Sequence, residues 1–423
     1  FRNSKITGAT YGIHFDGSTS GRIVIENCDI TGWTSFASTI TNVAITDTDF
    51  LNGNYNQLRF YQNAQMTNCT FNPDMTIDFG KNEVDAEFTD CSVTDGSPLT
   101  DVIYLGDIVE MGVDVTINDE PVIVEAKVAD NNGDNASYFL VLQEALNAAQ
   151  ANQTVTVLQD ITLDQTATIA AGKEVVLDLN GKTISQTKAQ TTGYEMILND
   201  GNLTIVDNTT EKLGKISYTD SGNGGQYVSN TITNRGTITV KSGTIENLSS
   251  QTVATNGYPY AIDSSIWGSA AEVNTNVEGG KVHGATYSAI RLRADSTTEP
   301  VNVTVTGGEI VGTIEVQNPN SAVAGKGTLK ISGGKLSNSG TANVLFFFGS
   351  GASGENIVAE VTGGEFTGNI TMSTGAYIGD GFNKNFITGG TFSIDVNDYC
   401  APGYICVLND NGTYGIIPGL MGD

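Results

Sequence analysis

Basic residues are scarce in this chain. Its 423 residues include 20 Lys and Arg against 47 Asp and Glu, which gives a formal net charge of −27 at pH 7. Nucleic acids and anionic membrane surfaces repel such a protein, because both are bound through clusters of Lys and Arg. We therefore expect no nucleic-acid partner. The same charge helps to keep a large β-sheet protein in solution.

Long apolar runs are also missing. No segment approaches the roughly 18 consecutive apolar residues of a membrane-spanning helix, so we expect no membrane insertion. The first residues, Phe1 to Ile6, do not resemble a signal peptide, and a Leu-Pro-x-Thr-Gly sorting motif is absent from the other end. We expect both ends to be truncated, with any anchor outside this sequence.

Cysteine is sparse and odd in number. The chain has five, and Cys28, Cys69 and Cys91 recur at one position of a short repeat, which indicates buried thiols that pack as small apolar groups. Cys400 and Cys406 flank a five-residue segment. A small disulfide loop between them stays open, because the sequence does not reveal the redox compartment.

Glycine, in contrast, is abundant and periodic. The pattern apolar-x-small-Gly-x-apolar occurs six times, with second glycines 37, 28, 26, 30 and 26 residues apart. A period of about 20–50 residues is typical of stacked repeats, in which each copy buries its apolar face only against its neighbours. The copies begin at Val240, Val277, Val305, Ile331, Val361 and Ile387.

A shorter repeat fills the first part of the chain. Each copy reads Asn or Asp, a small residue, a polar residue and an apolar residue. Because alternate residues of a strand share a face, we expect the small and apolar residues to point inward and the Asn or Asp to lie at a turn. The copies start 24, 20, 21 and 22 residues apart, at Asn3, Asn27, Asp47, Asn68 and Asp90.

A polar junction, residues 119–136, lies between the two repeats. Its Asp130, Asn132 and Asp134 offer oxygen ligands at alternating positions, as a calcium loop does, but the glycine and distal glutamate of an EF-hand are absent. We interpret the segment as an interdomain turn. Calcium binding is the weaker alternative.

A single helix is predicted over residues 138–151. Ser137 is placed to cap it, and the apolar residues follow helical spacing. Such a helix covers the open end of a stack of strands. We therefore expect an all-β solenoid of two stacked right-handed parallel β-helices, one over residues 1–118 and a helix-capped one over residues 137–423.

Stacking the copies in register predicts which residues face one another. The residue after the second glycine runs Lys281, Glu309, Lys335 and Glu365. Opposite charges thus alternate on strands about 4.8 Å apart, where facing pairs stabilise the register. We interpret this column as structural and not catalytic.

A second column is expected to point apolar side chains inward. The following residues then point outward, and Arg291 lies between Asp263 and Glu315. We interpret Arg291 as part of a salt bridge, with a cationic site for an acidic sugar, shared with Arg293, as the alternative. The inward column is Ile262, Ile290, Ile314, Leu345 and Ile370.

The candidate ligand-binding residues gather near this second column. Aromatic rings beside carboxylates form carbohydrate platforms, and two phenylalanines exposed on one face are unusual for a soluble monomer. Packing beneath loops is the alternative interpretation. The candidates are Tyr258, Tyr260, Asp263, Trp267, Tyr287, Arg291, Arg293, Phe346 and Phe348.

No catalytic constellation emerges from the sequence. Inverting glycosidases need two carboxylates about 6.5–9.5 Å apart, but acidic residues are too common here for one pair to be diagnostic. We find no phosphate loop, zinc-ligand spacing or serine–histidine arrangement. His14 stands alone and is interpreted as structural. We predict no catalytic residue and no bound cofactor.

Four features of residues 137–417 carry a resemblance to a known family. They are the helix that runs into Thr154, the segment Leu177 to Ile184, the Gly-Gly repeat, and the closing stretch from Phe392 to Tyr404. On these features the chain resembles the Gly-Gly-x-Phe repeat, pectin-lyase-like β-helix proteins of gut-bacterial surfaces. The resemblance implies an adhesin-like surface protein and assigns no catalytic residue.

We therefore expect an extracellular or cell-surface protein that presents a binding face to a glycan or a surface protein. Two alternatives stay open. One is the stalk of a phage tail fibre or another appendage, which is usually trimeric. The other is a polysaccharide lyase or glycoside hydrolase.

Overall fold

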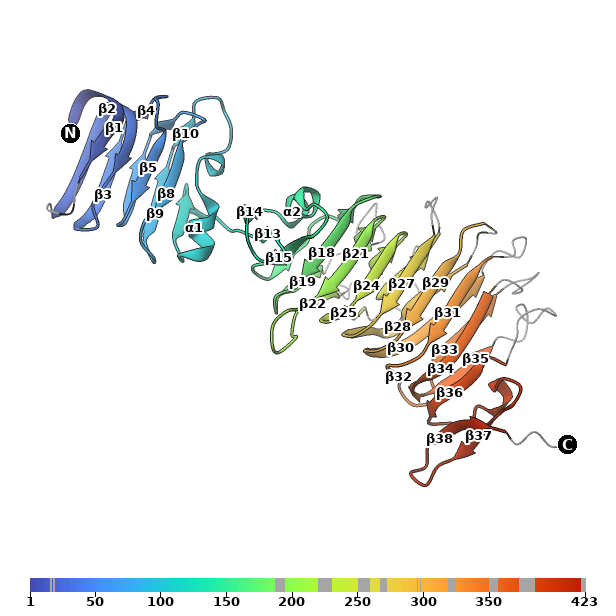
Figure 1. Ribbon diagram of the computed structural model, residues 1–423. Coiled ribbons are helices and arrows are strands. Elements are labelled where there is room, and N and C mark those ends of the chain that lie inside the picture. The colour runs from blue at the N-terminus through green and yellow to red at the C-terminus, as the bar shows by residue number, and fades with distance from the viewer. Residues whose placement is uncertain are drawn as a thin grey trace. The chain divides into compact units, whose positions relative to one another are not determined.

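Strands make up almost all the regular structure of this protein, which confirms the expected all-β class (Figure 1). The computed structural model describes the chain except residues 16, 18–19, 187–194, 220–229, 250–258, 267–271, 295, 297, 319–324, 350–356, 373–384 and 420–423. Two compact units result. Unit 1 comprises Phe1–Val124 and Ser137–Val141, and unit 2 comprises Glu125–Ala136 and Leu142–Asp423.

Unit 1 contains two long strands, β1 and β2, a series of short strands, the 3₁₀ helix η1 (Leu99–Asp101) and one short α-helix, α1, that was not predicted. In chain order the elements are β1 (Arg2–His14), β2 (Gly21–Ser35), β3 (Ile40–Thr46), β4 (Asp49–Phe50), β5 (Gln57–Phe60), β6 (Ala64–Thr67), β7 (Thr70–Phe71), β8 (Thr76–Phe79), β9 (Asp85–Thr89), β10 (Ser92–Val93), α1 (Leu105–Glu110), β11 (Asp114–Ile117), β12 (Glu120–Pro121) and β14 (Ser137–Phe139).

Three parallel ladders of unit 1 meet in the long strand β2. Its beginning pairs with β3, its middle with β4 and its last residues with β5. From there the ladders continue as β3–β6–β9–β11, β4–β7–β10 and β5–β8. On its other edge β2 pairs with β1, also in parallel.

The turns of unit 1 repeat Asn or Asp in the left-handed conformation. Asn3, Asn27, Asp47, Asn68 and Asp90 have φ between 49° and 54°, which Asn and Asp tolerate better than most residues with a side chain. Asn27 Nδ2 also donates to Asn3 Oδ1 over 2.7 Å. The predicted turn position of the short repeat is confirmed.

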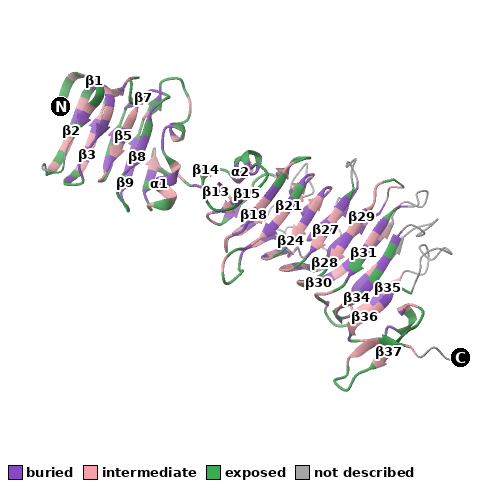
Figure 2. Ribbon diagram, in the orientation of Figure 1, coloured by how far each residue is buried: buried purple, intermediate pink, exposed green. Residues whose placement is uncertain are grey.

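The inward side chains of unit 1 form one apolar core. Phe50 and Phe71 stack with their centroids 5.3 Å apart. Cys28 and Cys69 are buried, as predicted, whereas Cys91 is only half-buried. Buried and more exposed residues alternate along the strands (Figure 2), as expected for a sheet with one face toward the core.

Unit 2 begins with a strand and a helix and then consists of strands. The elements are β13 (Ala126–Asp130), α2 (Leu142–Ala148), β15 (Gln153–Val157), β16 (Ile161–Thr162), β17 (Ala167–Ile169), β18 (Glu174–Asp178), β19 (Thr183–Gln186), β20 (Glu195–Asn199), β21 (Asn202–Val206), β22 (Lys215–Tyr218), β23 (Asn230–Asn234), β24 (Thr237–Val240), β25 (Thr244–Asn247), β26 (Ile262–Ser265), β27 (Val273–Val277), β28 (Lys281–Arg293), β29 (Val301–Val305), β30 (Glu309–Asn318), β31 (Gly327–Ile331), β32 (Lys335–Ser337), β33 (Asn343–Gly349), β34 (Ile357–Thr367), β35 (Asn369–Met372), β36 (Ile387–Phe392), β37 (Tyr404–Leu408) and β38 (Tyr414–Pro418).

Three parallel ladders also organise unit 2. The first runs β15–β18–β21–β24–β27–β29–β31–β34, and the second runs β16–β19–β22–β25–β28–β30–β32–β34. The third ladder runs β17–β20–β23–β26–β28–β30–β33–β35. An antiparallel hairpin, β37–β38, follows β36.

The Gly-Gly pairs lie where the chain turns from the first ladder to the second. The second glycine of each of the six copies has φ between 66° and 111°, a conformation that strains residues with a Cβ. The first glycine is required for another reason. A Cβ at Gly307 would lie 2.3 Å from the carbonyl oxygen of Glu278 in the preceding copy.

Both predicted columns of unit 2 are present. Lys281 pairs with Glu309, Glu309 with Lys335 and Lys335 with Glu365. Ion pairs join Lys281 to Glu309 over 3.4 Å and Lys335 to Glu365 over 3.6 Å. The inward column is in register and buried along Ile262, Ile290, Ile314, Leu345 and Ile370.

Helix α2 is shorter than predicted, and Ser137 does not cap it. Ser137 lies in strand β14, while the carboxylate of Glu125 accepts the Leu142 N–H over 2.7 Å and so satisfies a free donor at the helix start. The amide of Gln143 both donates to the Thr168 carbonyl over 3.0 Å and accepts its N–H over 2.7 Å. The Gln143 side chain thus makes the hydrogen bonds to Thr168 that a neighbouring strand would otherwise make at this edge of β17.

The glycine requirement gives a stability prediction. Gly308 and Gly340 both have positive φ, 77° and 58°. A Cβ at Gly308 meets the Gly279 carbonyl oxygen at 2.7 Å, whereas nothing lies within 4 Å at Gly340. Both alanine variants carry φ strain of about 1–2 kcal/mol, but only Gly308→Ala adds steric overlap, which costs about 1–3 kcal/mol. Calorimetry should show the larger fall in unfolding temperature for Gly308→Ala. Equal shifts would contradict this account of the corner.

Candidate functional site

The predicted ligand-binding residues fall on the third ladder of unit 2. Tyr260, Asp263, Arg291 and Arg293 lie in or beside β26 and β28, and Phe346 lies in β33. The remaining candidates lie outside the described residues, or have side chains that do, namely Tyr258, Trp267, Tyr287 and Phe348.

An ion pair joins two of the three charged candidates, Asp263 and Arg291. Strand register places Asp263 directly against Arg291. The guanidinium donates from Nε to Oδ1 over 2.7 Å and from Nη2 to Oδ2 over 2.5 Å. This planar, two-bond geometry is specific to arginine. The predicted salt bridge is present, with Asp263 as the partner.

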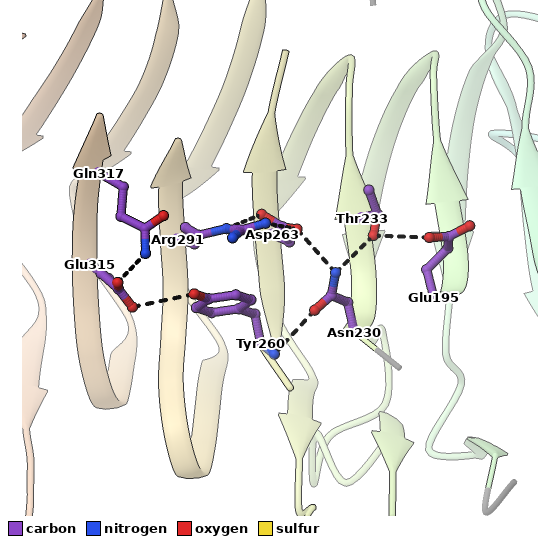
Figure 3. Close-up of polar contacts among 8 residues, drawn as sticks. All are labelled: Glu195, Asn230, Thr233, Tyr260, Asp263, Arg291, Glu315 and Gln317. Atoms are coloured by element: carbon purple, nitrogen blue, oxygen red, sulfur yellow. Dashed lines mark hydrogen bonds and ion pairs between the residues drawn. The ribbon is translucent and has the colours of Figure 1, made fainter. Parts of the chain in front are cut away.

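Tyr260 connects the ion pair to Glu315 on β30. The guanidinium carbon of Arg291 lies 4.4 Å from the centroid of the Tyr260 ring, and the Tyr260 hydroxyl donates to Glu315 Oε2 over 3.4 Å. Ser288 donates to the same oxygen over 3.0 Å, and Gln317 donates to Oε1. Figure 3 shows the contacts of Glu315 with Tyr260 and with Gln317.

Asn230 extends the contacts in the other direction. Its Nδ2 donates to Asp263 Oδ2 over 3.0 Å and to Thr233 Oγ1 over 3.1 Å, and its Oδ1 accepts the Tyr260 N–H over 3.2 Å. Thr233 donates to Glu195 Oε2 over 3.4 Å. We call the whole set the polar network: Glu195, Asn230, Thr233, Tyr260, Asp263, Arg291, Glu315 and Gln317 (Figure 3).

The centre of the polar network is buried, which corrects the expectation of an open, outward column. Asp263, Arg291 and Glu315 are 4%, 8% and 4% exposed, and Tyr260 is completely buried. Burial by itself lowers the pKa of Arg291, but the charge of Asp263 opposes this and holds the pKa above its ordinary value. Arg291 is therefore a permanent cation.

Two other candidates are less exposed than an open ligand site requires. Phe346 was expected to be exposed and is half-buried, and Arg293 is also half-buried. Arg293 pairs in register with Ser265 and Gln317. Phe347 is 2% exposed, as expected for a core residue.

The geometry of the polar network suits structure better than acid–base chemistry. Both oxygens of Asp263 accept hydrogen bonds, from Arg291 and Asn230, and both oxygens of Glu315 do so as well. A general acid or base needs a carboxyl oxygen within hydrogen-bond reach of a substrate. Here the protein itself occupies those positions, so the network fixes the register of β23, β26, β28 and β30.

The weak calcium candidate is bound within its own turn. Asn135 donates to Asp130 over 2.7 Å, and Gln153 donates to Asp130 over 3.0 Å. These hydrogen bonds lower the pKa of Asp130. Asn132 donates to Asp134 over 2.7 Å. Within the described residues, no group of three or more His, Cys, Asp and Glu side chains is arranged to hold a metal ion.

The disulfide left open between Cys400 and Cys406 is not formed in this structure, where both are free thiols. Cys400 is buried and donates to the Val396 carbonyl over 3.6 Å, while Cys406 accepts the Val396 N–H over 3.5 Å. Burial raises the pKa of Cys400 to about 11. Each thiol therefore anchors the chain around Val396.

A cluster of aromatic rings in unit 1, formed by Tyr11, His14 and Trp33, was not predicted from the sequence. The centroids of Tyr11 and Trp33 are 5.3 Å apart, those of Tyr11 and His14 are 5.2 Å apart, and those of His14 and Trp33 are 5.8 Å apart. His14 therefore packs against two rings, and its Nδ1 also lies 2.7 Å from Ser35 Oγ. We call these three residues the ring cluster. The signal that could have revealed it is the glycine-rich sequence around Tyr11.

Comparison of the chain with protein-family models, with curated proteins and with solved structures finds no match. Among the described residues, no helix is both long and apolar enough to span a membrane.

The polar network predicts unequal effects for two cation-to-methionine variants. Arg291→Met strands the buried carboxylate of Asp263 without its counter-charge, which should destabilise unit 2 by about 3–5 kcal/mol. Lys335→Met removes an exposed ion pair, whose contribution is about 0–1 kcal/mol. Thermal unfolding followed by circular dichroism compares the two. The double variant Asp263→Leu with Arg291→Met should regain part of the loss. A similar small shift for both single variants would contradict a structural role.

Proposed function

We propose that this chain is the β-helical part of an extracellular, adhesin-like surface protein that presents a rigid binding face to a glycan or a surface partner. The resemblance of residues 137–417 to Gly-Gly-x-Phe repeat proteins belongs to this proposal. We infer that each unit is a right-handed parallel β-helix and that it serves as a rigid scaffold for the binding face.

Strand pairing supports the β-helical part of the proposal. In unit 2 the chain visits the first, second and third ladders in order and then returns to the first, as β18, β19, β20 and β21 do. Each visit pairs in parallel with the strand one repeat earlier. Right-handed crossovers between parallel strands are the strong preference, which favours a right-handed coil.

The single observation that best supports a non-catalytic role is that the carboxylate oxygens of Asp263 and Glu315 are already hydrogen-bonded to the protein. Both carboxylates are buried, and each of their oxygens accepts a hydrogen bond from another side chain of the protein. An enzyme that hydrolyses polysaccharides needs an acid–base pair whose carboxyl groups are free to face the substrate. The described charged columns are instead used to hold strands in register.

The acidity of the chain supports an uncharged or weakly charged partner. The formal net charge is −27, and 20 basic residues must serve the whole molecule. Four of the eight described Lys–acid and Arg–acid ion pairs, those of Arg59, Arg235, Arg291 and Lys215, involve a carboxylate side chain that is at most 29% exposed. Few cations remain to attract an acidic polymer.

The test uses the intact chain with a panel of soluble plant, fungal and bacterial polysaccharides. We expect retention of the protein in affinity electrophoresis with at least one polysaccharide, no release of reducing ends or unsaturated products, and a monomer by light scattering. The variant Lys335→Met, which loses only an exposed ion pair, is the control and should behave as the wild type in binding. Release of reducing ends or unsaturated products would show an enzyme, and a trimer without any ligand would favour the appendage stalk.

A further inference from the structure

The ring cluster of unit 1 lies on the outward side of β1 and β2. Tyr11 pairs in register with Trp33, and His14 pairs with Ser35. Tyr11 is 51% exposed, His14 is exposed and Trp33 is half-buried. The ring planes are inclined to one another by 30°, 38° and 40°. Three rings thus form an accessible aromatic surface in a protein that buries most of its phenylalanines.

An irregularity in β1 creates this surface. Residues three apart on a regular strand point to opposite faces, yet Tyr11 and His14 lie in ring contact. Register shifts before and after Tyr11 explain how both side chains reach one face. Such bulges re-aim side chains and are enriched beside functional sites.

Glycines make the irregularity possible. A Cβ at Gly8 would lie 1.7 Å from the Tyr11 carbonyl oxygen, and one at Gly12 would lie 2.6 Å from the Thr31 carbonyl oxygen. Gly32, which precedes Trp33, has φ of 93°. The backbone is therefore packed against itself at the cluster, which holds the rings in one arrangement.

A polar strip continues the surface along β5 and β8. Trp33 precedes Thr34, which pairs with Leu58, so the outward neighbour of Trp33 on β5 is Gln57. Asp78 accepts from Gln57 over 2.6 Å and from Arg59 over 2.9 Å and 2.6 Å. Arginine carries five N–H donors, and these contacts use two. The strip offers planar hydrogen-bonding groups with balanced charge.

One donor of the ring cluster has no protein acceptor. The indole Nε1 of Trp33 is shielded from solvent and makes no hydrogen bond. Tryptophan N–H groups in such places usually find a partner, and an unsatisfied donor is costly. A ligand oxygen that reached this nitrogen would satisfy it.

We propose that the ring cluster, with Gln57 and Arg59 held in place by the buried Asp78, binds a neutral saccharide. Sugar C–H groups pack on aromatic faces while hydroxyls bond to planar polar side chains, and both features stand here side by side. Four strands span roughly 14 Å, which suits a few sugar rings, whereas a protein partner covers an area of roughly 800 Å². The Arg59–Asp78 pair has no net charge to select an acidic sugar.

This inference rests on the proposed function and specifies its ligand class and its place in unit 1. The test uses the full chain carrying Trp267→Phe, so that Trp33 is the only remaining tryptophan of two. Titration with neutral oligosaccharides should change the Trp33 fluorescence. In the wild-type background, Tyr11→Ala and Trp33→Ala should each weaken affinity by about tenfold, the worth of one aromatic contact. Tyr404→Ala, an exposed tyrosine of unit 2, is the matched control and should change nothing.

Three outcomes would overturn the inference. Glycan binding that survives both Tyr11→Ala and Trp33→Ala places the ligand elsewhere and leaves the proposed function standing. Binding restricted to acidic glycans rejects the neutral class. Absence of binding to any glycan rejects both this inference and a glycan-presenting function. Because Tyr11 is exposed, Tyr11→Ala should keep the wild-type unfolding temperature, and a loss of binding in that variant cannot be attributed to misfolding.

Discussion

Parallel pairing in register places every residue directly against the equivalent residue of the neighbouring strand, and most of this structure follows from that constraint. Like side chains then accumulate in columns about 4.8 Å apart. Stacked apolar residues such as Ile290 and Ile314 stabilise the pairing of their strands, whereas like charges in the same positions would repel each other and destabilise it. Lys281, Glu309 and their successors therefore alternate in sign, and Arg291 is held by a carboxylate on the strand next to it.

The repetitive part of the fold could be predicted from the sequence because its cause is local. A second glycine at positive φ, an Asn or Asp at a turn and an inward Ile each recur with the repeat, so their positions could be read from spacing alone. The start of α2 could not, since it depends on Glu125 from a distant segment. The burial of Asp263 and Arg291 could not be predicted either. It depends on Tyr260, which packs over the ion pair and does not recur with the repeat.

The polar network and the ring cluster differ in which groups they leave free to contact a ligand. In the polar network, each oxygen of Asp263 and Glu315 already accepts a hydrogen bond from the protein, and the charged centre is buried. In the ring cluster, Tyr11 is exposed and the Trp33 nitrogen lacks an acceptor. The polar network could be recognised in the sequence because its carboxylates and arginines are conspicuous. The ring cluster could not, because a bulge, which strand alternation does not predict, brings Tyr11 and His14 together.

The central claim is that the polar network holds the scaffold together while the ring cluster meets the ligand. Amide hydrogen exchange of the intact chain, measured by mass spectrometry with and without a neutral glycan that it binds, tests both halves at once. The account predicts slower exchange on glycan addition in β1, β2 and β5, with β26, β28 and β30 already protected and unchanged. Slower exchange confined to β26, β28 and β30 would contradict it.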